Sequence, residues 1–215
     1  MPLPRGMAAL AIAWIVASFA ITVGSRTPIQ PTSGAYTPEV RTFLALLALG
    51  GCVLWPVGRI MLAPDGFCRR RTALDAATLV VLLQAIYWPT HLVTSWPLMR
   101  ALAIDALLCG WVIAFGAAIA WATGPGRRRA GWAIACIALA GGGAVLDAMG
   151  IRAPLPEIAG PFAALLTLAP LGAAGSGPAH WELAAWPWVV AFTAWCLLMR
   201  AAPEGSRVAP LEGFR

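Results

Sequence analysis

The sequence of 215 residues contains no lysine, and charged residues of all kinds make up only 11% of it. An average soluble domain has about 25% charged and about 45–50% apolar residues. Here 60% of the residues are hydrophobic and the mean hydropathy is +0.77. A soluble globule of this size cannot bury so much apolar surface. The scarcity of charge therefore argues against a soluble protein and predicts an all-α, polytopic integral membrane protein.

Sequence motifs of soluble enzymes and of metal proteins are also missing. No two of the five cysteines have C-x-x-C spacing, so the sequence does not indicate a disulfide framework or a zinc site. The chain has no P-loop, no H-E-x-x-H and no G-x-G-x-x-G that opens a soluble βα unit. We therefore expect a non-catalytic protein, with no cofactor and no metal implied by any motif.

The positive charge comes from arginine alone. The 15 arginines give a net charge of +6, and they lie in short clusters between apolar runs. A nucleic-acid interface would gather this charge on one soluble face, whereas short clusters at the ends of apolar runs are typical of topology signals. We therefore predict that the chain binds no nucleic acid. Its expected partners are the lipid bilayer and other membrane or cytoplasmic protein subunits.

Six apolar runs approach the length of about 20 residues that a membrane span requires. The first of them resembles a signal peptide, but it is about 18 residues long, and the apolar part of a signal peptide has about 7–15. We therefore predict an uncleaved first helix, and we treat 1–215 as a single transmembrane domain. The predicted spans are 7–24, 42–58, 75–93, 97–122, 130–149 and 181–199.

A seventh apolar segment, 161–175, has about 15 residues and is interrupted by Pro170. This length predicts a short interfacial or re-entrant helix rather than a span. The arginines agree, because six spans place eleven of them on one side and four on the other, whereas seven spans would give eight and seven. The positive-inside rule then predicts six spans with both termini cytoplasmic. The expected location is a cell membrane, most simply the inner membrane of a bacterium.

Ionisable side chains inside a bilayer are costly, and each is therefore a candidate site. His91 near the end of the third span and Asp105 near the start of the fourth are expected at similar depths, so we predict that they face each other. Asp147 and Glu182 lie at the same outer boundary. A purely structural interpretation is also open, because Pro89 removes a helical hydrogen bond and nearby polar groups can satisfy the freed backbone. The candidate residues for an ion, a proton or a ligand are His91, Asp105, Asp147 and Glu182.

Three functions are compatible with these features. The first is a non-catalytic, membrane-embedded subunit of a transporter or of a larger membrane complex. The second is an enzyme or a membrane redox subunit, in which the outer histidines and acids bind haem, quinone or a metal. The third is a small proton- or ion-coupled carrier that uses His91 and Asp105. The absence of catalytic motifs favours the first.

Overall fold

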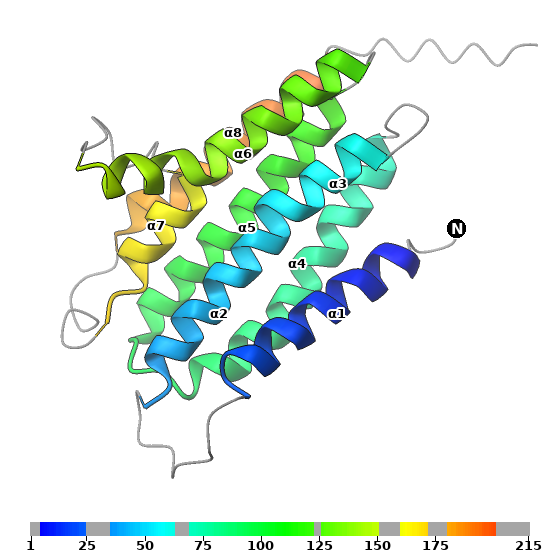
Figure 1. Ribbon diagram of the computed structural model, residues 1–215. Helices are drawn as coiled ribbons and strands as arrows, with labels where there is room; N and C mark the ends of the chain where they lie inside the picture. Colours follow the sequence, from blue (N-terminus) through cyan, green and yellow to red (C-terminus); the bar gives the residue numbers. More distant parts are fainter. Residues whose placement is uncertain are drawn as a thin grey trace, which may run out of the picture.

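The computed structural model describes residues 5–24, 35–62, 69–122, 126–150, 160–171 and 180–200. All regular structure in these ranges is helical, and no strand occurs in them. The prediction of an all-α chain is therefore confirmed. Most of the helices run along one common direction, so that the bundle has two distinct ends (Figure 1).

Within the described ranges, five helical segments are long and apolar enough to cross a bilayer, which supports a membrane-embedded chain. They contain 20 to 26 residues, or about 30–39 Å of helix against about 30 Å of hydrocarbon core. Helix α4 begins earlier than the predicted third span, because three arginines form its first turn outside the apolar stretch. The five segments are Thr37–Leu62 (α2, η1 and α3), α4 (Arg69–His91), α5 (Leu98–Trp121), α6 (Gly126–Ala148, apolar from Arg128) and α8 (Trp181–Arg200).

The first predicted span is the shorter helix α1 (Arg5–Ile21). Its 17 residues give about 25 Å of helix. Several of its large apolar side chains are exposed, among them Leu10, Val16 and Ile21. Exposed apolar side chains of this kind suit contact with lipid. The described part of the chain thus has five helical segments of full membrane length, and α1 is a little shorter than these.

The helical segment Thr37–Leu62 continues without a break through Pro56. It consists of α2 (Thr37–Leu49), the π-helical turn η1 (Gly50–Leu54) and α3 (Trp55–Leu62). In an α-helix the ring of Pro56 would press against the carbonyl of Cys52 and leave it without an N–H partner. The wider turn relieves this, and the Trp55 N–H bonds to the Gly50 carbonyl five residues back. The helix therefore extends to Leu62, beyond the predicted end at 58.

The short helix predicted within 161–175 is present as α7 (Gly160–Leu168). Its nine residues give about 14 Å, which is too short for a span. It is packed into the bundle against α2, α5 and α6, and Leu165 and Leu168 are fully buried. Residues 172–175 of the predicted segment lie outside the described ranges.

Two arginines and a tryptophan hold the end of α7. Side-chain nitrogens of Arg41 and Arg100 donate to the carbonyls of Leu166 and Leu168, at 3.4 and 3.3 Å, and Trp96 Nε1 donates to Pro170 at 3.2 Å. These carbonyls have no partner within the helix, and positive charge is favourable at a helix C-terminus. Residues from α2, from the start of α5 and from the turn before it therefore fix this short helix in place.

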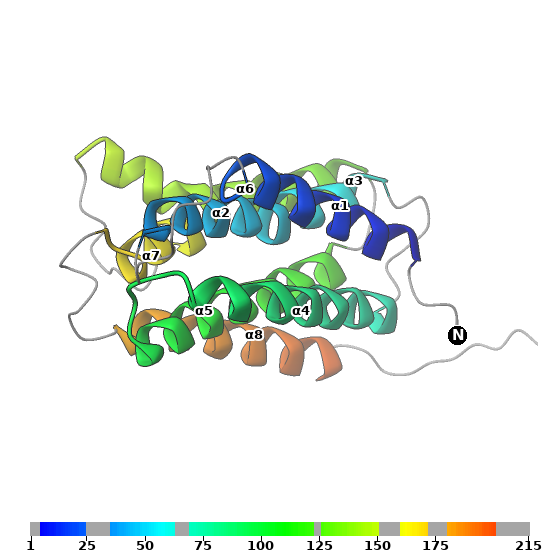
Figure 2. The same ribbon diagram turned by 90° about the horizontal axis from the view of Figure 1, so that it is seen from below.

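The helices form two layers (Figure 2). Helices α1, α2, α3, α6 and α7 lie in one layer, and α4, α5 and α8 in the other. Helix α5 lies between α4 and α8, and it also contacts α3 and α7 of the first layer. Within its most apolar stretch 72% of the residues are buried, the highest share among the five long helices. Helix α5 is therefore the centre of the bundle.

The contact between α5 and α8 depends on tryptophans spaced by seven residues. Trp188 Nε1 donates to the Ala106 carbonyl at 2.8 Å, and Trp195 Nε1 donates to the Ile113 carbonyl at 3.2 Å. Seven residues are almost two helical turns, so both indoles lie on the same face of α8. A glycine at position 110 lets α8 approach closely. These bonds fix the depth of α8 relative to α5.

Arginine is concentrated at one end of the bundle, the end where α1 begins and α8 finishes (Figure 1). Arg59 of α3 and Asp75 of α4 form an ion pair there, with a distance of 2.9 Å between Nη2 and Oδ2. The described arginines of the opposite end are Arg41 and Arg100, near the starts of α2 and α5. The arginines in helices at the rich end are Arg5, Arg59, Arg69, Arg70, Arg71, Arg127, Arg128, Arg129 and Arg200.

Candidate functional site

Three helices place polar side chains at one depth, about a third of the way in from the arginine-poor end. Gln84 lies seven residues before the end of α4, Asp105 lies seven residues after the start of α5, and Trp188 lies seven residues after the start of α8. Seven residues correspond to about 10 Å along each helix. Because α4 and α5 are antiparallel neighbours, Gln84 and Asp105 meet.

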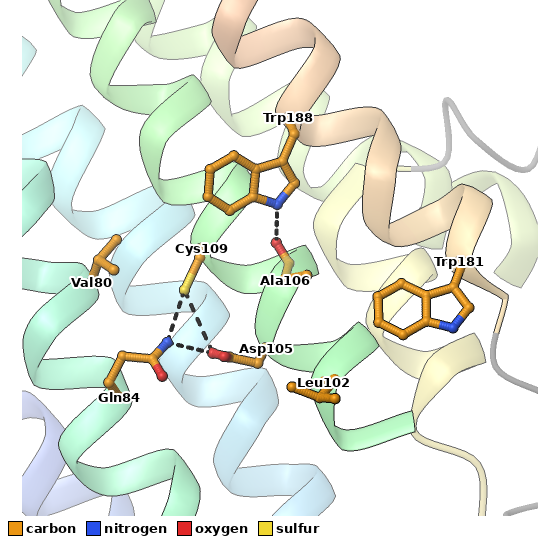
Figure 3. A pocket seen from close by; sticks show the side chains of 8 residues that line it. All are labelled: Val80, Gln84, Leu102, Asp105, Ala106, Cys109, Trp181 and Trp188. Carbon is orange, nitrogen blue, oxygen red and sulfur yellow. Dashed lines mark hydrogen bonds between the residues drawn. The ribbon is translucent and has the colours of Figure 1, made fainter. Parts of the chain in front are cut away.

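The polar cluster consists of Gln84, Trp88, Asp105 and Cys109 (Figure 3 shows all but Trp88). Gln84 Nε2 donates to Asp105 Oδ1 at 2.6 Å and to Cys109 Sγ at 3.2 Å. The Cys109 thiol donates in turn to Asp105 Oδ1 at 3.5 Å. Trp88 Nε1 donates to Gln84 Oε1 at 2.7 Å, which fixes the orientation of the amide. The cluster therefore holds one oxygen of the carboxylate in a defined position.

The other oxygen of Asp105, Oδ2, has no hydrogen-bond partner among the described residues. Within the same ranges, no arginine or histidine forms an ion pair with Asp105. A carboxylate in apolar surroundings is costly unless a charge or a set of donors compensates it. Asp105 therefore needs either a proton or a bound ligand at Oδ2.

A groove of about 430 Å³ lies beside Asp105, on the outward face of the layer formed by α4, α5 and α8 (Figure 3). Ligand sites commonly have volumes of about 300–1,000 Å³, with mainly apolar walls and a few polar groups. This groove is an open one, but its volume lies in this range, Asp105 and Gln84 are its polar groups, and the remaining walls are apolar or aromatic. The lining residues are Val80, Gln84, Leu102, Asp105, Ala106, Cys109, Trp181 and Trp188.

The predicted contact between His91 and Asp105 is not formed. His91 Nδ1 lies 3.5 Å from the Thr94 hydroxyl, and its ring lies against Trp88 with 6.2 Å between the centroids. The reason is depth: α4 ends at His91, whereas Asp105 lies two turns inside α5. Gln84, two turns before His91, therefore occupies the position opposite Asp105.

The two remaining candidates lie outside the cluster. Asp147 is exposed near the end of α6, in the other layer. Glu182 is exposed at the start of α8, and its Oε1 lies 3.0 Å from His180 Nδ1. Neither residue lines the groove, although Trp181, next to Glu182, does. The structure thus retains Asp105 as the centre of the site and separates it from the other three candidates.

The sequence alone assigned no role in a site to Gln84, to Cys109 or to the groove tryptophans. A signal for them exists in the spacing. Asp105 and Cys109 are four residues apart on α5, as are Gln84 and Trp88 on α4, so each pair lies on one face of its helix. Polar residues that share a helix face within a span indicate an intramembrane cluster.

The described residues contain no group of three or more His, Cys, Asp or Glu side chains arranged to hold a metal ion. Comparisons with protein-family models, with curated proteins and with solved structures give no significant match to this chain. The groove beside Asp105 is therefore the feature from which a function can be inferred.

Proposed function

We propose that the protein is a non-catalytic, membrane-embedded subunit of a transport system, and that the groove beside Asp105 holds the transported molecule. The observation that carries this proposal is the free Oδ2 of Asp105 at the wall of a groove of about 430 Å³. An intramembrane carboxylate is expensive to maintain and commonly marks a substrate or ion pathway. Asp105 also differs from Asp75, the other aspartate within a long helix, because Asp75 is paired with Arg59, whereas Asp105 has no cationic partner among the described residues.

The proposed topology has six spans, with α1 as the first, and both termini in the cytoplasm. The support is the concentration of arginine at the end where α1 begins and α8 finishes. Positive residues near the ends of spans are retained on the cytoplasmic side. Under this topology the groove opens in the outer half of the membrane. The arginine-rich end then faces the cytoplasmic subunits that we expect as partners.

The proposal is tested by reaction with dicyclohexylcarbodiimide, an apolar reagent that enters membranes and modifies protonated carboxyl groups. The full chain in lipid nanodiscs is treated with the reagent, and the modified carboxyl is located by peptide mass spectrometry. We expect modification at Asp105, because this residue lines the groove and has no cationic partner among the described residues. Failure to modify Asp105 in the folded protein would refute the groove as a ligand site.

Asp75 serves as an internal control for this reaction. It also lies in a membrane-length helix, but its side chain is 1% exposed and paired with Arg59. We therefore expect it to remain unmodified. The Asp105→Asn variant should show no modification at position 105, and its amide oxygen can still accept the hydrogen bond from Gln84. Equal modification of both aspartates would indicate unfolding rather than a specific site.

A second candidate function is a proton- or ion-coupled carrier in which Asp105 alone is the coupling group. The same free oxygen favours it, because a carboxylate without a cationic partner readily exchanges a proton or a metal cation with its surroundings. Proteoliposomes loaded with a pH-sensitive dye distinguish the two functions. A carrier moves protons without any partner subunit and loses this activity in Asp105→Asn, whereas a transport subunit is inactive alone.

A further inference from the structure

The charge of the groove depends on one residue. Of the eight lining residues only Asp105 has a carboxyl group, and neither arginine nor histidine is among them. The free Oδ2 is therefore a focus of negative potential in a low-dielectric wall, where a charge acts more strongly than it does in water. An anionic ligand is disfavoured by this arrangement. A cation in the groove compensates the carboxylate directly.

The opposite wall consists of two indole rings. Trp181 and Trp188 lie seven residues apart on one face of α8, and both rings line the groove beside Asp105 (Figure 3). The bond from Trp188 Nε1 to the Ala106 carbonyl fixes the orientation of that ring. Indole faces attract cations more strongly than other aromatic side chains do, and most strongly where water is excluded.

Three further lining residues are aliphatic. Val80 of α4 and Leu102 and Ala106 of α5 supply apolar surface around the carboxylate. A hydrated metal ion would leave this surface uncovered, since hard cations prefer several oxygen ligands. A cation with its own apolar groups would cover it and would gain from burial.

We propose that the groove binds an organic ammonium ion, with the nitrogen beside Asp105 Oδ2 and the indoles of Trp181 and Trp188, and with its apolar groups against Val80 and Leu102. This inference rests on the proposed function and names the class of molecule that the site takes. The amide of Gln84 assists by holding Oδ1, so that Oδ2 remains directed to the ligand.

The test uses two probes of nearly equal shape. Benzyltrimethylammonium carries a positive nitrogen, and neopentylbenzene has a neutral carbon in its place. Binding of each probe to the full chain in nanodiscs is measured by equilibrium dialysis against empty nanodiscs. We expect saturable binding of the ammonium probe to the wild type, and an affinity at least tenfold lower in Asp105→Asn. The neutral probe should bind the wild type and Asp105→Asn equally.

Two further variants separate the charge from the aromatic wall. Trp181→Leu keeps an apolar side chain at an exposed position. It should lower the affinity for the ammonium probe about three- to tenfold and leave the affinity for the neutral probe unchanged. Asp147→Asn removes an exposed acid outside the groove and should leave binding of both probes unchanged. Size-exclusion chromatography establishes that each variant is folded.

The outcomes distinguish this inference from the proposed function. If the carbodiimide modifies Asp105 but the ammonium probe binds no better than the neutral one, the ligand class is wrong and the groove remains a site. If Asp105→Asn binds the ammonium probe as tightly as the wild type, the charge has no role and the inference fails. If neither reagent reaches Asp105, both proposals fail.

Discussion

Gln84 donates a hydrogen bond of 2.6 Å to Asp105, across the contact between α4 and α5. The two residues lie on different helices, equally far from the same end of the bundle, and each has a second polar neighbour one turn away on its own helix. This bond ties the central helix to α4 where the groove opens. It therefore serves both packing and the orientation of the carboxylate.

Removal of this hydrogen bond should weaken the bundle measurably. In the cycle of Gln84→Ala, Asp105→Ala and the double variant, we expect a coupling free energy of about 0.6–2 kcal/mol, the range found for hydrogen bonds between transmembrane helices. The free energy of unfolding is measured by circular dichroism during titration with sodium dodecyl sulfate in mixed micelles. A parallel cycle of Gln84→Ala with Asp147→Ala should give no coupling. Similar coupling in both cycles would show that the effect is not specific to this pair.

Gly110 determines how closely α8 approaches α5. A Cβ atom at this position would lie 2.9 Å from Pro187 Cβ and 3.0 Å from the Trp188 ring. We therefore expect Gly110→Ala to lower the free energy of unfolding by about 1–3 kcal/mol. Gly142→Ala on α6 is the matched control, since a Cβ there meets no atom within 4 Å, and it should be neutral or stabilising by up to about 1 kcal/mol. Equal effects of the two variants would contradict the close contact.

Gly160 begins α7 with a φ of +75°, directly against the Leu139 carbonyl of α6. Gly150 has a similar φ of +73°, but a Cβ there would meet nothing within 4 Å. An alanine costs about 1 kcal/mol or more at either position because of the backbone conformation. Only Gly160→Ala adds a steric clash, which is with the Leu139 carbonyl. Gly160→Ala should therefore lower the free energy of unfolding by at least about 1 kcal/mol more than Gly150→Ala does. The same detergent titration measures both.

The number of spans is decided by comparing the two termini. A peptide epitope is placed at the N-terminus or at the C-terminus, and its cleavage by an added protease is followed in right-side-out and inverted vesicles. Six spans place both epitopes in the cytoplasm, so both are cleaved only in inverted vesicles. If α1 does not cross, the five long helices place the termini on opposite sides, and the N-terminal epitope is cleaved only in right-side-out vesicles.

The positions of the long helices were predictable because a membrane span must meet two simple physical requirements. It requires about 20 apolar residues and intrahelical hydrogen bonds for the backbone. The apolar runs at 97–122 and 181–199 therefore matched α5 and α8 almost to the residue. The second span was predicted as 42–58, which is too short at both ends, since the helical segment covers Thr37–Leu62. The structure accommodates Pro56 within this segment by a π-helical turn.

The hydrogen-bond partner of Asp105 could not be predicted from the sequence in the way that the helix positions could. The depth of a residue was estimated from the length of an apolar run, and the end of the third run lay two residues beyond the true end of α4. Even a correct helix end does not give the rotation of α4 about its own axis, which decides whether Gln84 faces α5 or the lipid. That rotation follows from the packing of Tyr87, whose hydroxyl bonds to the Ala101 carbonyl at 2.8 Å.

The sequence by itself determined the class of this protein, since a chain with so few charges and with long apolar runs is stable only with its helices in contact with lipid. It also determined that a carboxylate lies within an apolar helix, at Asp105. The tertiary structure decided what surrounds that carboxylate. The groove exists because α5 lies between α4 and α8, and its two indoles come from a helix more than 70 residues further along the chain. Apolar periodicity specifies which segments are buried but not which helices become neighbours, because many arrangements bury the same surface.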